Sequence, residues 1–444
     1  MKRQKTSPAD FCFGKVKNAV VYWFRKDLRL HDQVVLNDLF ASNTPFVALY
    51  CLDETLFQHN QWGFQNSSAI PIQFLLDTLK ALEKQLAALG VPLVFQVGKP
   101  AHKILAYVSQ NQVREVYTEI LPGTNEEAQL AHLQTAAARG GFLLHTHQKN
   151  TLLAIKDLPF DLSALPAVFT VFRKKVELHA MPSSVVQMTF PQWPALSRTT
   201  TIPNLTELGY PIPAAEKRQP YVFEAGEKGG LARLNKYFWQ NHHIKTYKET
   251  RNGLVGDTYS SRLSPWLALG AVSPRLIYAE LKRYETENGA NESTYWLYFE
   301  LLWRDYFQFV ALQAGAQLFQ PGGIREQTAH SSFKPAVFDR WRFGKTGQPF
   351  VDANMRELLQ TGWMSNRGRQ NVASYLIHDL KQDWRAGAAW FEAQLIDYDV
   401  ASNYGNWNYL AGVGNDPHEN RRFNLEKQAA QYDADGAYRR LWLS

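Results

Sequence analysis

The feature that most constrains the fold is an alternation of short apolar runs with helical patterns over the first third of the chain. The apolar runs cover Ala19–Phe24, Phe46–Leu52, Leu93–Val97, Glu115–Ile120 and Phe142–Thr146. Between the second and third runs, Ile72–Leu89 repeats apolar residues at helical spacing. Such strand and helix repetition predicts a five-stranded parallel sheet covered by helices on both faces. We therefore predict an α/β unit over residues 19–150.

The loop after the first predicted strand is expected to border a pocket. Parallel sheets bind ligands beyond the carboxyl ends of their strands. Arg25–Asp32 follows the first strand directly. This places a polar, charged segment at the edge where ligands are found.

The pattern changes near residue 151. Residues 151–230 hold many prolines and little periodicity, which predicts a long linker wrapped on the surface. Helical spacing then returns, and the longer predicted helices are Leu231–Asn241, Pro274–Glu287, Ser293–Ala314 and Asn366–Lys381. The linker is thus expected to join the α/β unit to an all-helical unit over residues 231–444.

Composition narrows the partners and the compartment. The formal net charge is +7, a basic excess that suits a polyanionic partner without identifying one. Cys12 and Cys51 are the only cysteines, too few for a disulfide framework, and a reducing cytoplasm fits. We find no apolar run of signal-peptide or membrane-spanning length and expect a cytoplasmic protein without a membrane partner. Thirteen tryptophans indicate either large aromatic cores or a stacked cofactor and flipped bases.

Two apparent motifs fail on inspection. Gly344-Lys345-Thr346 resembles the end of a phosphate-binding loop, but Asp339 occupies the position of the required first glycine. His242 and His243 are adjacent, so they cannot both face one metal from a helix or strand, and the sequence has no HExxH or CxxC. We therefore expect no metal, and a nucleotide-dependent transferase lacks the phosphate loop that it would need.

One predicted helix carries a charged and aromatic face. Trp296, Glu300, Trp303, Arg304 and Phe307 fall three or four positions apart and share that face. A surface ion pair of about 0.2–0.5 kcal/mol beside a core stripe would explain it. However, the flanking residues are apolar enough to bury the helix all round, and buried charges need partners, which favours a functional face.

Three further elements combine polar groups with aromatic ones. Ser365 is a plausible helix cap, and the helix after it has a polar face of Asn366, Arg369, Gln370 and Ala373. Asp397, Asp399 and Asn403 precede the aromatic run 404–409, where either aspartate could instead cap a helix. Residues 258–265 contain several hydroxyl groups and an arginine just before a helix, which suits a phosphate site. Serine-rich turns that cap helices are also common, so an ordinary cap would explain this segment as well. Together these elements describe a cavity suited to a flavin dinucleotide.

These residues resemble the photolyase and cryptochrome family from about Ala19 to the end of the chain. The resemblance is carried by Trp23–Arg29, Ser261–Pro265, Leu302–Tyr306 and Gly362–Arg367. Within the family the chain is similar to the DASH branch of cryptochromes. The stretches for this are Tyr247–Gly253, Asn366–Gln370 and Ser402–Trp407.

The resemblance implies a U-shaped FAD held noncovalently by the helical unit. The residues that would hold its phosphates are Tyr247, Ser260, Ser261, Arg262, Leu263 and Ser264. Those expected around its rings are Arg304, Asn366, Arg369, Asp397, Asp399 and Asn403. Asn403 would face the reactive flavin nitrogen, and Arg369 would pair with Asp397.

The resemblance also implies a deoxyribodipyrimidine photolyase, in which light-excited, reduced FAD donates an electron to a cyclobutane pyrimidine dimer. Glu300 would form hydrogen bonds to the flipped bases and Trp303 would stack on them. Arg251 and Arg367 would bind DNA phosphates. Gln370 and Tyr409 stand where duplex-repairing relatives carry an apolar residue and a tryptophan. Weaker base stacking then predicts activity on single-stranded DNA, with loop-structured duplex or RNA left open.

Further expectations concern electron supply and the antenna. Trp407 and Trp384 match two members of the family's tryptophan relay, whereas Ser331 stands at the third position. The branch implies a methenyltetrahydrofolate antenna, for which Glu119 is the candidate ligand. A monomer is expected.

The alternative function is that of a photosensory cryptochrome that repairs nothing. Glu300, Trp303 and the lack of a long tail after Trp442 favour repair.

Overall fold

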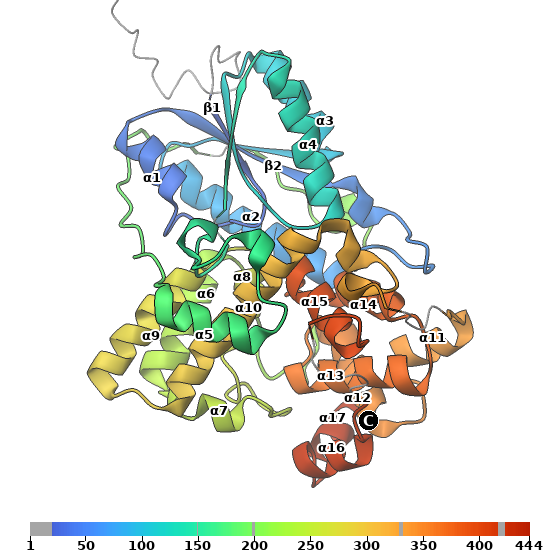
Figure 1. Cartoon of the computed structure of the whole chain (residues 1–444). Coiled ribbons are helices and arrows are strands. Elements are labelled where there is room, and N and C mark those ends of the chain that lie inside the picture. The colour runs from blue at the N-terminus through green and yellow to red at the C-terminus, as the bar shows by residue number, and fades with distance from the viewer. Residues whose placement is uncertain (1–19, 149, 198–199, 328–331, 416–421) are drawn as a thin grey trace, which may run out of the picture.

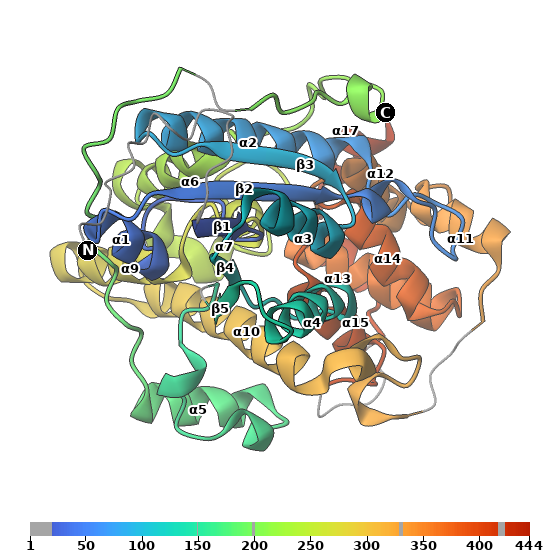
Figure 2. The same ribbon diagram turned by 90° about the horizontal axis from the view of Figure 1, so that it is seen from above.

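The five apolar runs of the sequence are strands of one parallel sheet. The computed structural model describes residues 20–148, 150–197, 200–327, 332–415 and 422–444, so Ala19 and Ser331 lie outside the described residues. The strands are β1 Val20–Phe24, β2 Phe46–Asp53, β3 Leu93–Gly98, β4 Glu115–Glu119 and β5 Leu143–His147. Their order is β3-β2-β1-β4-β5, and β1 aligns Val20 with both Phe46 and Glu115 (Figure 2). The predicted five-stranded parallel sheet is confirmed.

Side-chain alternation gives the sheet two different cores. Tyr22 and its alternate neighbours pack against α1 (Val34–Ala41) and α2 (Ala69–Ala88). Val21 and the other set pack against α3 (Pro100–Asn111) and α4 (Thr124–Ala138). The α1 and α2 side continues without a break into residues of the helical half. The two halves therefore share one core on that face.

From α6 onward the chain is mainly helical, as predicted for residues 231–444 (Figure 1). Its helices are α6 Gly226–Asn235, α7 Tyr247–Thr250, α8 Ser264–Ala268, α9 Pro274–Asn288, α10 Glu292–Ala314, α11 Pro335–Arg342, α12 Pro349–Thr361, α13 Asn366–Ser374, α14 Trp384–Gln394, α15 Val400–Leu410, α16 Leu425–Tyr432 and α17 Ala437–Leu443. Capping explains several starts: Ser365 Oγ accepts the Gly368 N–H, and Asn291 and Thr294 form a reciprocal capping box. Within the described residues, no helix has the length and apolar character to cross a bilayer.

The linker is not only a surface strap, which differs from the prediction. It contains α5 (Phe169–His179), whose Phe169, Phe172 and Val176 are buried in the main core. These three residues follow helical spacing, but the surrounding proline-rich sequence hid the pattern. The amino-terminal part of the linker is therefore part of the packed structure.

The loop after β1 forms a seam between the two halves. The Leu28 N–H donates to the Leu269 carbonyl at 3.1 Å, and the buried Asp32 carboxylate meets Arg275 at 2.8 Å. Gly270 has a φ of +65°, and a Cβ there would lie 1.8 Å from the Lys26 carbonyl oxygen. The segment expected to border a pocket is instead held tightly against the helical half.

The start of the linker is fixed to α10 by Asp305. This fully buried carboxylate accepts the N–H groups of Leu152 and Leu153 at 2.9 and 2.8 Å. Burial raises its pKa to about 7, opposed by these two hydrogen bonds. One side chain thus satisfies two backbone donors that no water can reach.

We predict that Asp305→Ala lowers the free energy of unfolding by about 2–4 kcal/mol, because two buried N–H groups lose their acceptor. Denaturant unfolding followed by circular dichroism measures the change. The matched control is Asp77→Ala on α2, which removes an ion pair whose two side chains are each 44% exposed. It should cost less than about 1 kcal/mol. Equal losses in the two variants would contradict the assigned role of Asp305.

Candidate functional site

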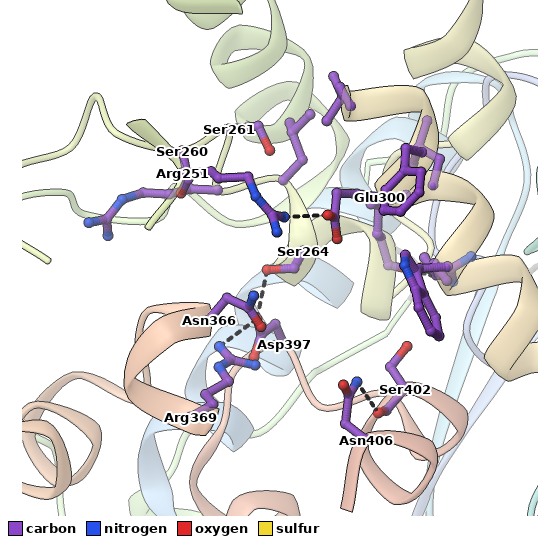
Figure 3. A pocket seen from close by; sticks show the side chains of 18 of the residues that line it. Arg251, Ser260, Ser261, Ser264, Glu300, Asn366, Arg369, Asp397, Ser402 and Asn406 are labelled. Carbon is purple, nitrogen blue, oxygen red and sulfur yellow. Dashed lines mark hydrogen bonds and ion pairs between the residues drawn. The ribbon is translucent and has the colours of Figure 1, made fainter. Parts of the chain in front are cut away.

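A cavity of about 410 Å³ lies in the helical half, between the loop before α8 and helices α10, α13 and α15 (Figure 3). Its lining includes many of the residues singled out from the sequence: Tyr247, Arg251, Ser260, Ser261, Arg262, Leu263, Ser264, Glu300, Trp303, Arg304, Asn366, Arg369, Gln370, Asp397 and Tyr409. A smaller pocket of about 110 Å³ shares Asn366, Arg369, Gln370 and Asp397 with it. The smaller pocket adds Asp399, Asn403 and Trp407. Segments far apart in sequence are therefore gathered at one site.

One end of the cavity holds a buried cation. Arg262 is 2% exposed, has a φ of +53°, and donates from Nη2 to the Gly256 carbonyl at 2.7 Å. Its Nε and Nη1 have no hydrogen-bond acceptor among the described residues. The guanidinium also lies over the rings of Tyr259 and Trp363. The buried carboxyl of Glu357 is near enough for Arg262 to lower its pKa, but the two unused donors of Arg262 still need an acceptor, and a phosphate fits this need.

Arg233 on α6 shapes the loop that carries this end of the cavity. Its guanidinium is 2% exposed and donates to the carbonyls of Asp257, Ser260 and Ser261 at 2.7, 2.9 and 2.8 Å. It lies between the rings of Tyr221 and Tyr237. Sequence reasoning missed this residue, although an arginine within an apolar helical pattern was a visible signal. By binding three carbonyl groups, Arg233 fixes the loop from behind.

An ion pair lies near the same Trp363 ring, which the Arg369 guanidinium also contacts. Arg369 Nη2 lies 2.9 Å from Asp397 Oδ2, and Ser264 Oγ donates to the same oxygen at 2.6 Å (Figure 3). Asp397 Oδ1 is buried and has no donor among the described residues. The pairing expected for Arg369 is thus present. The remaining oxygen is available to a ligand N–H group.

Asp399 and Asn403 line the smaller pocket in different ways. Asp399 caps α15 by accepting the Ser402 N–H at 2.8 Å, and it also accepts two contacts from the Gln308 amide. Capping, the alternative weighed for this residue, is therefore its observed contact. Asn403 is anchored by donation from Nδ2 to the Ala388 carbonyl at 3.0 Å. This fixes the amide at the wall of the pocket.

Glu300, Arg251 and Trp303 form a third group at the cavity wall. Glu300 on α10 forms an ion pair with Arg251 (Figure 3). Burial raises the pKa of Glu300, and Arg251 opposes this shift. The Trp303 ring stacks on Phe169 of the linker with centroids 3.7 Å apart, and Tyr409 lies edge-on to it at 6.0 Å.

The other two predicted arginines are held by the protein itself. Arg304 lines the cavity and donates to the carbonyls of Asn150 and Leu267. Arg367 is not among the lining residues of either pocket; its Nη2 donates to Asn252 Oδ1 at 3.1 Å. Burial lowers the pKa of Arg367, and the nearby charge of Arg251 lowers it further. Arg367 thus contacts Asn252, the residue that follows Arg251 in the chain.

The remaining candidates lie away from the main cavity. Trp407 and Trp384 are buried in one aromatic core, but only Trp407 borders the smaller pocket. Trp384 donates its indole N–H to the Pro321 carbonyl at 3.0 Å. Glu119 is the buried last residue of β4, and its carbonyl accepts from Arg25 Nη1 at 3.2 Å. In the described part of the chain, no three His, Cys, Asp or Glu residues gather around a metal-sized site.

The cavity fits FAD on its own chemistry. Its size is within the usual range for ligand sites. The unused donors of Arg262 suit the negative phosphates, and Asp397 Oδ1 suits a ring N–H group. Trp363, which lies beneath both Arg262 and Arg369, adds an aromatic wall. These features match a ligand with an anionic middle and a flat, hydrogen-bonding ring.

Comparisons with known proteins agree with this geometry. Residues 296–444 match the family described as the FAD binding domain of DNA photolyase, and residues 20–195 match DNA photolyase. A cryptochrome DASH of Gloeobacter violaceus is 45% identical over 96% of this chain and 85% of that protein. The crystal structure of a Synechocystis cryptochrome is 42% identical over 97% of this chain and 89% of that chain, with a TM-score of 0.92. A class III photolyase of Agrobacterium tumefaciens is 26% identical, with a TM-score of 0.79 over 96% of this chain and 86% of that chain.

We predict that Arg233→Gln weakens FAD binding by about tenfold to a hundredfold, because the loop carbonyls lose their charged donor. Fluorescence titration of the FAD-free protein measures the dissociation constant. The control is Lys236→Gln, which removes a 46% exposed ion-pair partner of Asp257 and should change affinity less than twofold. Unchanged FAD affinity in a folded Arg233→Gln protein would contradict the role of Arg233.

Proposed function

Because the chain belongs to the DASH branch of the photolyase and cryptochrome family, we propose that it repairs cyclobutane pyrimidine dimers in light, preferentially in single-stranded DNA. The proposal rests chiefly on one observation. Glu300 and Trp303 line the same cavity as the groups suited to FAD. A hydrogen-bonding carboxyl group and a flat ring beside the cofactor site are what two extruded bases require.

Each part of the cavity has a distinct task in this proposal. Bound reduced FAD supplies, on absorbing light, the electron that splits the dimer. Arg262 and the loop around Ser260 hold its phosphates, while Arg369 and Asp397 orient its ring. Glu300 forms hydrogen bonds to the bases. Trp303 and Tyr409 contact the flat faces of the bases. No side chain needs to act as a nucleophile.

Preference for single strands follows from a balance of two energies. Extruding a dimer from a duplex costs a few kcal/mol of unpairing and unstacking, which a single strand largely avoids. Stacking on an aromatic side chain returns about 1–3 kcal/mol per base. Tyr409 and Gln370, both of which line the cavity, offer less stacking surface than a tryptophan and an apolar residue. The stacking free energy gained in this cavity is then too small to offset the cost of extruding a dimer from a duplex.

A photosensory protein without repair activity is the second candidate. It would share the residues suited to FAD, so these cannot separate the two functions. A pure sensor has no chemical need for Glu300 and Trp303 beside the cofactor site. Their presence supports repair.

The proposal extends to electron supply, the antenna and the setting. Trp407 borders the smaller pocket and shares a core with Trp384, which suits a relay toward the flavin. Glu119 lies at the carboxyl end of β4, where ligands of parallel sheets bind, and is the candidate contact for methenyltetrahydrofolate.

The net charge of +7 supports a nucleic-acid partner. We propose a monomer in the cytoplasm, where the buried Cys51 would stay reduced.

We expect the FAD-loaded, reduced protein to restore pyrimidines under blue light faster in dimer-containing single strands than in the matching duplex. Chromatography of the illuminated oligonucleotides measures the rates. Glu300→Ala should retain FAD but slow splitting by about tenfold, because the bases lose their hydrogen bond to this carboxyl group. Flavin-loaded protein that restores neither substrate would refute repair and favour the sensor.

We expect Tyr409→Trp to raise duplex repair by about tenfold relative to single-strand repair, because a larger ring returns more stacking energy. Tyr409→Phe, which keeps the ring size, serves as the control and should leave the ratio nearly unchanged. The same chromatographic assay gives both rates. If the tryptophan variant keeps the wild-type ratio, stacking at this position does not set the preference.

A further inference from the structure

Arg251 and Glu300 cannot perform their separate proposed tasks while they bind each other. The proposed function assigns Arg251 to a DNA phosphate and Glu300 to the extruded bases. In the structure their side chains form an ion pair at the cavity wall (Figure 3). Substrate binding must therefore break this ion pair, or else Arg251 cannot bind the phosphate and Glu300 cannot bind the bases.

The surroundings of Glu300 make Arg251 its principal counter-charge. Burial raises the pKa of Glu300, and Arg251 is the largest opposing influence. The other neighbours are Tyr247 on α7 and the Trp296 indole on α10 itself, both neutral at physiological pH. The other arginines of the cavity contact groups other than Glu300: Arg369 pairs with Asp397, Arg304 donates to two carbonyls, and Arg262 donates to the Gly256 carbonyl and keeps two donors unused.

Arg251 is placed to exchange partners. Its side chain is 20% exposed, and its guanidinium lies 5.5 Å from the Trp296 ring centroid rather than being enclosed by carbonyl groups. Arg367 is close enough for the charge of Arg251 to lower its pKa. A guanidinium group binds a phosphodiester through the same pair of parallel hydrogen bonds that it offers to a carboxylate. A bound DNA strand is thus a strong competitor for Arg251.

We propose that a phosphodiester of the bound strand takes Arg251 from Glu300, and that this exchange converts Glu300 from an ion-paired carboxylate into a protonated acid facing the bases. The proton comes from solvent through the cavity mouth. The neutral acid donates an O–H hydrogen bond to a pyrimidine carbonyl, which the carboxylate cannot do. This inference rests on the proposed function and makes Arg251 a positioning residue for Glu300.

The exchange has a consequence for the substrate class. Only a dimer that carries its backbone phosphates supplies the anion that frees Glu300. A dimer of the free bases fits the same cavity but leaves the ion pair in place. The protein would thus select phosphodiester-linked lesions through the protonation of one carboxyl group.

The experiment follows the carboxylic-acid infrared band of Glu300, in the dark, in the FAD-loaded protein. The band is identified by its loss in Glu300→Gln. We expect saturation with a single-stranded oligonucleotide containing one thymine dimer to raise the titration midpoint of Glu300 by at least about one pH unit, a tenfold change in proton affinity. Thymine dimer without phosphate should leave the midpoint in place. An unchanged midpoint with the oligonucleotide, or an equal rise with the free-base dimer, would overturn the inference.

Three variants separate the exchange from a general loss of charge. Arg251→Gln should show the raised midpoint without DNA and little further rise with it, whereas Arg251→Lys should restore part of the wild-type behaviour. Arg367→Gln is the matched control: it should bind the strand less tightly but keep the midpoints of free and saturated protein. FAD absorbance and thermal unfolding verify folding. A wild-type midpoint in DNA-free Arg251→Gln would also overturn the inference.

The infrared result is independent of turnover, because no light is used. An intact midpoint shift without repair on illumination would count against the proposed function alone. Repair without a midpoint shift would count against the exchange alone.

Discussion

A buried arginine with unused hydrogen-bond donors governs the helical half of this protein. Arg262 is buried, and the buried carboxyl of Glu357 is near enough for Arg262 to lower its pKa, but two hydrogen-bond donors of Arg262 stay unused and a negatively charged ligand would satisfy them. Arg233 fixes the loop that carries Arg262, and Asp397 offers an unused acceptor in the same cavity. A phosphate-bearing cofactor would thus satisfy polar groups of the interior as well as supply chemistry.

The sequence allowed the sheet to be predicted almost strand by strand, because apolar runs and helical periodicity are local signals. The linker was harder, since α5 packs through only three apolar positions within a proline-rich stretch. The loop Arg25–Asp32 was misjudged for a related reason. Its charges fit an open pocket edge, but they are satisfied by the helical half, which local sequence cannot reveal.

The candidate site shows the same division. Motif resemblance gathered residues that the structure does bring to one cavity, including the pair of Arg369 and Asp397. The motifs could not show which charged side chains contact other groups of the protein rather than a ligand. Asp399 caps a helix and Arg304 holds two carbonyl groups, because such contacts depend on which backbone atoms lie nearby after folding. A list of charged residues therefore becomes a mechanism only when their partners are known.

The stacking of Phe169 on Trp303 joins the linker to the proposed substrate surface. The polypeptide between the two halves is then more than a tether, because it supplies one wall of the aromatic platform. A chimaera that carried the helical half with a foreign connector could still hold its flavin. It would nevertheless present Trp303 with a different neighbour, so the proposed lesion recognition should depend on the connector as well as on the helices around the cavity.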